Sequence, residues 1–212
     1  MISLTVLCEG QTEVNFVNQV LRPHLTQRNV FAKATNLGGG LSWKKLKREL
    51  NLTLQSRKSH EWLTTIFDLY KIMTVPDSPK IVSLSGVSKA MQMEEAMLEG
   101  LPNPNFLPYV QSYEFEALLY VDLDKLSVAF PDGDAEIGIS SLKREVKHLA
   151  PEDINEGEET APSKRLIREI PSYKHRKSTA GPQVVEHIGL PAIREKCPHF
   201  DGWVSRLEQL GR

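Results

Sequence analysis

The chain has 212 residues, of which 40% are hydrophobic and 25% are charged, and its formal net charge is −1 at pH 7. This length is enough for one large domain with a packed core, and the two cysteines, Cys8 and Cys197, are too far apart for a Cys-x-x-Cys metal or redox motif. No apolar run approaches the roughly 18 residues of a membrane span, so we expect a cytoplasmic protein that does not contact a membrane.

The first predicted element is an apolar strand, residues 4–8, that runs directly into Glu9, Gly10 and Glu13. Ligands of open α/β sheets bind at the carboxyl ends of strands, and a glycine there allows a tight turn. Glu9 is therefore the first candidate for an active-site residue. We expect Thr12 to cap a helix that begins near Glu13, which would direct Glu13 toward the same crevice.

Strands and helices then alternate along the first half of the chain. The first helix is expected to end at Pro23, because proline interrupts a helix. Residues 114–119 fit either an extension of the preceding strand or a short helix. Strands are predicted over residues 30–37, 62–70 and 106–111, with a break at residues 38–40, and helices over residues 43–56, capped by Ser42, and 85–99.

Beyond about residue 122 the pattern is mainly helical. Helices are predicted over residues 124–129, 140–149, 161–170, 183–188, 191–195 and 200–210. We therefore predict an α/β fold whose central, mostly parallel sheet is flanked by helices and formed by residues 1–122. Residues 123–212 are predicted to be a mainly helical extension that packs on this core.

A second carboxylate, Asp68, comes at the end of an apolar strand just as Glu9 does. If the two strands are neighbours, both carboxylates lie at one edge of the sheet. Carboxylates held close together repel each other unless a cation lies between them, and Mg²⁺ or Mn²⁺ prefers oxygen ligands of this kind. A metal ion bound there can neutralise phosphate charge and activate water for in-line attack.

Two further glutamates, Glu114 and Glu116, lie among apolar and aromatic residues. Glutamate is seldom buried without a partner, so both are candidates for the same site. In a strand they would share a face, whereas in a helix they would diverge by roughly 200°. The alternative is that one of them lies on the surface or pairs with an arginine.

Basic residues that could bind a phosphate or a nucleic-acid backbone occur in three clusters. One of them opens a predicted helix, whose N-terminal amides would also favour a phosphate. The alternative for each cluster is a solvated basic face. The candidates are Lys44 and Lys45 in the first cluster, Lys164 and Arg165 in the second, and Lys174 and Arg176 in the third.

The chain resembles Toprim-type proteins, the metal-dependent domain shared by topoisomerases, primases and the overcoming-lysogenization-defect nucleases. This general match covers about the first 120 residues. More closely, the chain is similar over nearly its whole length to a bacterial family of unknown function that is assigned to the Toprim-like group. The residues that carry the resemblance are 8–13 (CEGQTE), 38–40 (GGG), 67–70 (FDLY), 113–119 (YEFEALL) and 160–165 (TAPSKR).

The resemblance implies roles for three acids. Glu9 would be the Toprim glutamate that serves as metal ligand or general acid/base, and Glu13 would match the second glutamate of the nuclease branch. Asp68 would be the first acid of the Asp-x-Asp motif. The sequence departs from the motif at Tyr70, which stands where the second aspartate is expected.

Two other positions could complete the implied site. Glu114 or Glu116 would supply the missing metal ligand, and Lys164 would correspond to the lysine that steadies the scissile phosphate. Relatives in the nuclease branch are often encoded beside ATPases of the ABC or SMC type in phage-defence systems, so a companion ATPase is also implied.

Our leading prediction is a nuclease that depends on Mg²⁺ or Mn²⁺, hydrolyses DNA or RNA, and works with a partner ATPase in bacterial phage defence. The alternative, favoured by Tyr70, is a catalytically degenerate Toprim-like module that docks on an ATPase or a nucleic acid as a sensor or effector. A third interpretation is a small-molecule phosphotransferase or phosphatase. A homodimer is among the assemblies that the sequence allows.

Overall fold

The computed structural model of the protein describes residues 2–38, 42–55, 60–155 and 157–212. Its centre is a sheet in which β1 pairs in parallel with both β2 and β3, and β3 pairs in parallel with β4 and β5. This arrangement confirms the predicted α/β fold with a mostly parallel sheet. The strands are β1 (Ile2–Cys8), β2 (Val30–Asn36), β3 (Glu61–Asp68), β4 (Phe106–Leu107) and β5 (Val110–Gln111).

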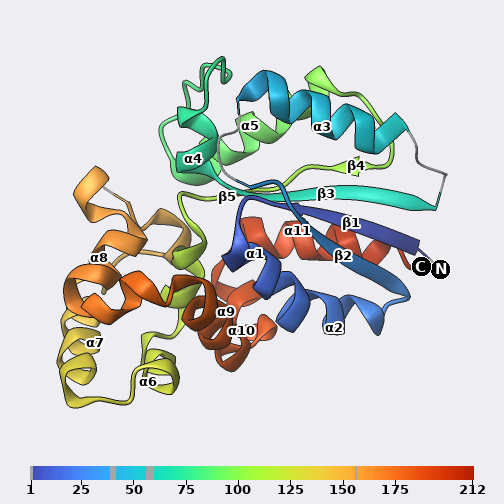
Figure 1. Cartoon of the computed structure of the whole chain (residues 1–212). Helices are drawn as coiled ribbons and strands as arrows, with labels where there is room; N and C mark the ends of the chain where they lie inside the picture. The colour runs from blue at the N-terminus through green and yellow to red at the C-terminus, as the bar shows by residue number, and fades with distance from the viewer. Residues whose placement is uncertain (1, 39–41, 56–59, 156) are drawn as a thin grey trace.

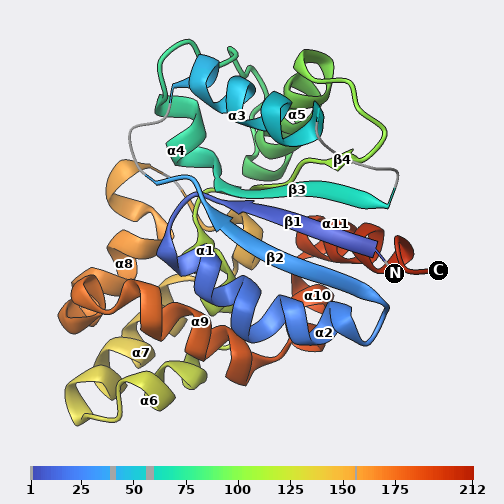
Figure 2. The same ribbon diagram turned by 45° about the vertical axis from the view of Figure 1, so that its right-hand side comes forward.

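Helices cover both faces of the sheet (Figures 1 and 2). One face carries α3 (Trp43–Gln55), α4 (Leu69–Thr74) and α5 (Gly86–Gly100). The other carries α1 (Gln11–Phe16), η1 (Val17–Leu21), α2 (Arg22–Thr26), α9 (Lys177–Ile188), α10 (Leu190–Lys196) and α11 (Pro198–Gln209). The remaining helical segments are η2 (Phe115–Val121), η3 (Leu123–Lys125), α6 (Leu126–Ala129), α7 (Gly133–Glu145), η4 (Pro151–Asp153), η5 (Glu158–Thr160), α8 (Pro162–Glu169) and η6 (Pro171–His175).

The strands divide their apolar side chains between two hydrophobic clusters, one on each face of the sheet. Val6 and Cys8 of β1 point into one cluster, and Leu7 between them points into the other. In β3, Ile66 and Phe67 divide in the same way. This alternation is the period of a β-strand, and burial on both faces explains why these strands are almost continuously apolar in sequence.

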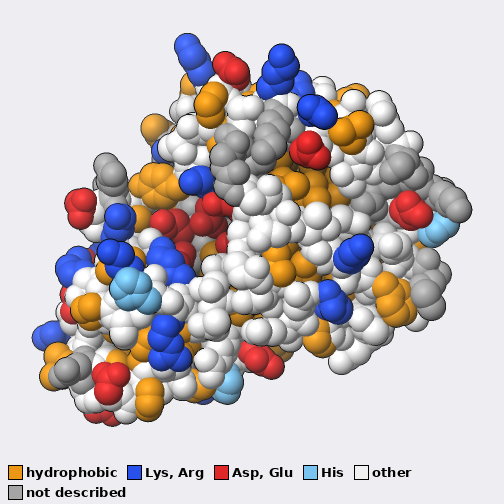
Figure 3. Space-filling view, in the orientation of Figure 1, with side chains coloured by type: hydrophobic (Ala, Val, Ile, Leu, Met, Phe, Trp, Pro, Cys, Tyr) orange, Lys and Arg blue, Asp and Glu red, His pale blue; other side chains and the backbone are white. Residues whose placement is uncertain are grey.

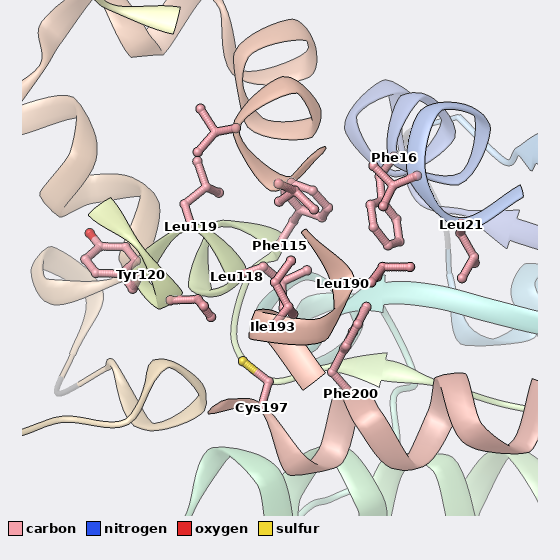
Figure 4. Close-up of a cluster of buried hydrophobic side chains, with 14 of the residues drawn as sticks. Phe16, Leu21, Phe115, Leu118, Leu119, Tyr120, Leu190, Ile193, Cys197 and Phe200 are labelled. Atoms are coloured by element: carbon pink, nitrogen blue, oxygen red, sulfur yellow. The ribbon is translucent and has the colours of Figure 1, made fainter. Parts of the chain in front are cut away.

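The larger cluster joins residues from both parts of the chain. Figure 4 shows Phe16 of α1, Phe115 of η2 and Phe200 of α11 in the same buried group. The ring centroids of Phe16 and Phe115 are 5.6 Å apart, and those of Phe16 and Phe200 are 6.1 Å apart. The helical part predicted for residues 123–212 therefore contributes to the same core as the strands.

The first helix differs from its prediction at both ends. Gly10 is the N-cap residue in place of Thr12, and the Glu13 carboxylate accepts a hydrogen bond from the Gly10 N–H at 2.8 Å. Pro23 does not end the helix, which continues to Thr26. The π-helical segment η1 precedes this proline, and such a wide turn accommodates a ring that would clash in a regular helix.

Other boundaries also shift. The third strand ends at Asp68, so Tyr70 lies in α4, and the predicted strand over residues 106–111 is two short strands. Residues 114–119, left open between strand and helix, enter a 3₁₀ helix at Phe115. The helix predicted over residues 140–149 begins earlier, because the Asp132 carboxylate caps α7 through the Ala135 N–H at 2.8 Å. The predictions for Gly39, Gly40 and Ser56 fall outside the described residues.

Within the described ranges, no helix is long and apolar enough to cross a membrane.

Helix α11 is attached to the sheet through Trp203, whose side chain is fully buried. Its Nε1–H donates to Thr64 Oγ1 of β3 at 2.8 Å, and the Thr64 hydroxyl donates to the Leu107 carbonyl at 2.5 Å. The indole also stacks on Tyr109, with centroids 4.3 Å apart and planes 10° apart. One threonine thus connects β3, β4 and the C-terminal helix.

The substitution Thr64→Val should lower the free energy of unfolding by about 1–3 kcal/mol, because it leaves the Trp203 N–H buried without an acceptor. Urea denaturation followed by tryptophan fluorescence measures this loss. Thr179→Val is the matched control, since Thr179 is an exposed residue of α9 and its hydroxyl donates to the carbonyl of Arg176, three residues earlier. Equal stability of the two variants would show that the Trp203 contact does not hold α11 in place.

Candidate functional site

The parallel register of β1 and β3 brings Glu9 and Asp68 together. Cys8 of β1 lies opposite Ile66 of β3, so both strands end at the same edge of the sheet. The Glu9 N–H donates to the Ile66 carbonyl at 3.4 Å, and the Glu9 carboxylate accepts from the Asp68 N–H at 3.2 Å. The two acids expected to meet at a sheet edge are therefore neighbours in the structure.

The segment after β5 contacts the Asp68 carboxylate. Gln111 pairs with Asp68 in the sheet, and the chain then turns at Tyr113, whose φ of 62° is unusual for a residue with a side chain. The turn returns the Phe115 N–H to Asp68 Oδ1 at 2.8 Å. The Asp68 carboxylate thus lies between the end of β3 and the start of η2.

Strand β5 has only two residues, and side chains from other elements hold it in place. Glu94 of α5 accepts from the Val110 N–H at 2.8 Å, and its carboxylate lies 3.0 Å from His199 Nε2 of α11. The Glu152 carboxylate accepts from the N–H groups of His199 and Phe200 at 3.1 and 3.0 Å. These contacts fix the strand that positions Tyr113 and Phe115.

Two more glutamates are buried beside the pair formed by Glu9 and Asp68. Glu13 is 5% exposed, and Glu116 is 4% exposed. Glu116 Oε1 accepts from the Tyr173 hydroxyl at 3.2 Å and lies 3.3 Å from Lys177 Nζ. The charges of both glutamates raise the pKa of Asp68, so Glu13 and Glu116 lie near the pair.

Glu114 has a different environment from the one we expected for a metal ligand. One of its oxygens accepts from the Ser163 N–H at 2.8 Å, and the other accepts from the Ser163 hydroxyl at 3.0 Å. Both oxygens therefore bind the N-terminus of α8, where a negative charge is favoured by the helix dipole. Glu114 thus attaches α8 to the segment after β5, and its role as a metal ligand stays a prediction.

The carboxylates raise one another's pKa values. Burial raises the pKa of Glu9 to about 7, and the Glu13 charge adds to this rise. Burial raises the pKa of Asp68 well above its ordinary value, with further increases from Glu13 and Glu9. The pKa of Glu13 is also raised, by burial and by Glu116, and the pKa of Glu116 is raised by burial although Lys177 opposes the shift. Acids that are close, buried and mutually repelling favour a bound cation.

Two lysines near these acids were missed as site residues by the sequence analysis. Lys71 lies in α4, three residues after Asp68, and it lines the same small cavity as Glu9. Lys177 begins α9 and pairs with Glu116. An earlier end to the predicted third strand would have placed Lys71 in the first turn of a helix beside Asp68. Nothing local in the sequence indicates the pairing of Lys177 with a residue 61 positions away.

Figure 3 shows acidic side chains gathered in a hollow on this face of the molecule, with lysine and arginine side chains on either side of it. This face thus combines a concentration of carboxylates with cationic side chains nearby. The hollow lies at the edge of the sheet where β1 and β3 end.

The predicted basic contacts have different outcomes. Arg165 has a side chain that is 3% exposed and forms an ion pair with Glu145, and its role as a nucleic-acid contact stays a prediction. Arg176 donates to the Ala129 carbonyl at 2.8 Å and lies over the Phe130 ring. Three of the predicted lysines, Lys44, Lys164 and Lys174, are exposed, and Lys45 lies in α3 with a side chain outside the described set.

The donor atoms fit Mg²⁺ or Mn²⁺ in chemistry, because the buried acids offer only carboxylate oxygens. As placed, no three His, Cys, Asp or Glu side chains in the described part of the chain form a group that could hold a metal ion. Mg²⁺ does not require such a cage, since proteins commonly bind it through one or two carboxylates, with water and substrate phosphates completing the octahedron. Glu9 and Asp68 are the residues that would hold the ion in this way.

A family model described as "Domain of unknown function (DUF4276)" matches residues 8–208 of the chain. The match includes both strand-end acids and extends to the C-terminal helix. No curated protein and no solved structure matches the chain.

The metal-free protein should be more stable near pH 5 than near pH 8. The pKa of Glu9 in the folded state is about 7, above its ordinary value, so its protonated form favours folding at low pH. This stabilisation, on the order of 1–3 kcal/mol for the single group, is lost as the pH rises through about 7. Thermal unfolding of chelator-treated protein across this range measures the effect.

Glu9→Gln should make the pH profile flatter, since the amide keeps an acceptor for the Asp68 N–H and carries no charge. Glu195→Gln, which changes an exposed glutamate of α10, is the matched control and should leave the profile unchanged. A wild-type profile that rises between pH 5 and pH 8, or identical profiles for Glu9→Gln and wild type, would contradict the shifted pKa.

Proposed function

We propose that this chain, which belongs to the DUF4276 family of unknown function, is a divalent-metal-dependent nuclease that hydrolyses phosphodiester bonds of DNA or RNA. The observation that carries the proposal is the meeting of Glu9 and Asp68 at the ends of two adjacent parallel strands. Buried glutamates and two lysines surround this pair. The phosphate oxygens of a phosphodiester would bind both to a metal ion held by the acids and to the nearby lysines.

Each group has a part in this proposal. Mg²⁺ or Mn²⁺ held by Glu9 and Asp68 would supply charge neutralisation and an activated water. Glu9, whose pKa is about 7, can accept or release a proton near neutral pH and is the candidate general acid/base. Lys71 and Lys177 lie near the acids and can bind the non-bridging phosphate oxygens. We keep Lys164 as a further candidate phosphate contact, because its side chain is exposed near the start of α8.

The relationship to Toprim nucleases is part of the same proposal. It is supported by the sequence resemblance and by the location of Glu9 and Asp68 at strand ends of a parallel sheet. A partner ATPase of the ABC or SMC type and a role in bacterial phage defence rest on the sequence resemblance alone. A basic helix with the exposed Lys44, together with Lys174, is a candidate surface for the nucleic-acid backbone.

A second candidate function is a binding module that has lost catalysis. Tyr70 occupies the position of the second motif acid, and in the structure its hydroxyl accepts from Asn155 Nδ2 at 2.7 Å. Both oxygens of Glu114, one of the two substitutes for the missing acid, accept hydrogen bonds from Ser163. In this function the site would bind a nucleic acid or a partner ATPase without cleaving a phosphodiester.

Asp68→Asn should abolish cleavage of single-stranded or double-stranded DNA or RNA in Mg²⁺ or Mn²⁺, with a rate loss of about 100-fold or more if the carboxylate is a metal ligand. Gel assays over this panel of substrates measure it. Asp124→Asn is the matched control, because Asp124 is an exposed acid that pairs with Lys143. Equal cleavage by wild type and Asp68→Asn, or the absence of cleavage with every substrate, would contradict the nuclease proposal.

Calorimetric titration with Mn²⁺ distinguishes the two candidate functions. A nuclease site should bind Mn²⁺ in the wild type and bind it at least 10-fold more weakly in Glu9→Gln, which removes a charged ligand. The binding module predicts no difference between these two proteins.

A further inference from the structure

A second cavity is lined by residues that are close in the sequence to those of the acidic site. Its side chains are different ones. Its volume is about 260 Å³, and the residues that matter for the argument are Tyr70 and Met73 of α4, Lys89 of α5, Tyr113 and Asn155. Ligand pockets for drug-sized molecules usually measure about 300–1,000 Å³. This cavity therefore suits a smaller group, such as a single planar ring system with its attached sugar.

Two aromatic rings give the cavity its character. The centroids of Tyr70 and Tyr113 are 6.2 Å apart, and the ring planes are inclined by 44°. The Tyr70 hydroxyl is held by Asn155 Nδ2 at 2.7 Å, and the backbone N–H of Tyr70 donates to the Tyr113 carbonyl at 3.2 Å. The two tyrosines thus form one connected unit.

The Tyr113 ring packs against Gly86, the first residue of α5. A Cβ atom at Gly86 would lie 2.3 Å from the Tyr113 ring, so only glycine permits this packing. The backbone of Tyr113 also has a φ of 62°, which costs free energy for a residue with a side chain. The Tyr113 ring is thus fixed at the cavity by its packing on Gly86 and by the turn of its backbone.

The position of the cavity connects it with the proposed cleavage site. Tyr70 follows Asp68 by two residues, and Tyr113 lies two residues before Phe115, whose N–H donates to Asp68 Oδ1 at 2.8 Å. Figure 3 shows hydrophobic side chains on the α4 side of the acidic hollow. A nucleotide whose phosphate lies at Asp68 would therefore have its neighbouring base near these rings.

We propose that the cavity formed by Tyr70, Tyr113, Lys89 and Asn155 binds one nucleobase of a nucleic-acid strand next to the scissile phosphate. The aromatic rings supply stacking surfaces for any base, the Asn155 amide can hydrogen-bond a base edge, and Lys89 can contact a phosphate. The inference rests on the proposed function for the identity of the substrate. It predicts a preference for strands with accessible bases over fully paired duplexes, because a base must leave its stack to enter.

The test compares a fluorescently labelled 12-nucleotide oligothymidylate with an abasic strand of the same length and charge, in buffer with chelator so that no cleavage occurs. Fluorescence anisotropy should show tighter binding of the base-bearing strand by wild-type protein. Tyr113→Ala should weaken binding of this strand by about 5- to 100-fold and leave binding of the abasic strand unchanged, since stacking contributes to only one of them. Tyr113→Phe should keep the preference.

Tyr70→Ala and Tyr70→Phe repeat the comparison at the second ring and keep the test decisive if Tyr113→Ala fails to fold, which circular dichroism would reveal. Phe31→Ala, which removes a partly exposed ring from the edge strand β2, is the matched control and should behave as wild type. An equal affinity of wild-type protein for both strands, or a base preference that survives in both alanine variants, would overturn the inference.

Thymidine monophosphate is the third ligand to be tested. Binding of this free nucleotide in a Tyr113-dependent manner, without binding of the strand, would assign the cavity to a free nucleotide and overturn its assignment to a strand. The base preference is measured without catalysis, so it can fail while cleavage succeeds. It can equally succeed in a protein that does not cleave, which separates this inference from the nuclease proposal.

Discussion

Two adjacent parallel strands that end at the same edge of the sheet force Glu9 and Asp68 into one small and poorly hydrated space. Much of the surrounding structure reduces the resulting repulsion. Backbone N–H groups of Gly10, Asp68 and Phe115 donate to the carboxylates, and Lys177 lies beside Glu116. These contacts compensate only in part, because the pKa values of the buried acids remain raised. A positive charge placed at this site would reduce the repulsion that remains.

The second half of the chain takes part in this arrangement directly. Ser163, at the start of α8, donates two hydrogen bonds to Glu114, and Tyr173 and Lys177 both contact Glu116. Two glutamates of the segment that follows β5 therefore help to attach α8, η6 and α9. Glu116 thus fixes the position of Lys177, the first residue of α9, beside the buried acids.

The sequence was sufficient to predict the α/β fold and the meeting of Glu9 and Asp68, because both depend on short apolar runs and on the rule that parallel strands share a carboxyl edge. It was insufficient where a long-range contact decides the outcome. Glu114 and Arg165 are candidate site residues in the sequence. In the structure, Glu114 accepts a hydrogen bond from Ser163 and Arg165 forms an ion pair with Glu145, and both partners are distant in the sequence. The pairing of Lys177 with Glu116 could not be predicted for the same reason.

The hydrophobic cluster that runs from β1 to α11 also limits how the chain can be divided. A fragment that stopped near residue 122 would leave the face around Phe16 and Phe115 open to water, where Phe200 now covers it. It would also lose the indole that connects Thr64 to the last helix. The acidic edge is made from the first half of the sequence, but its geometry is a property of the intact polypeptide.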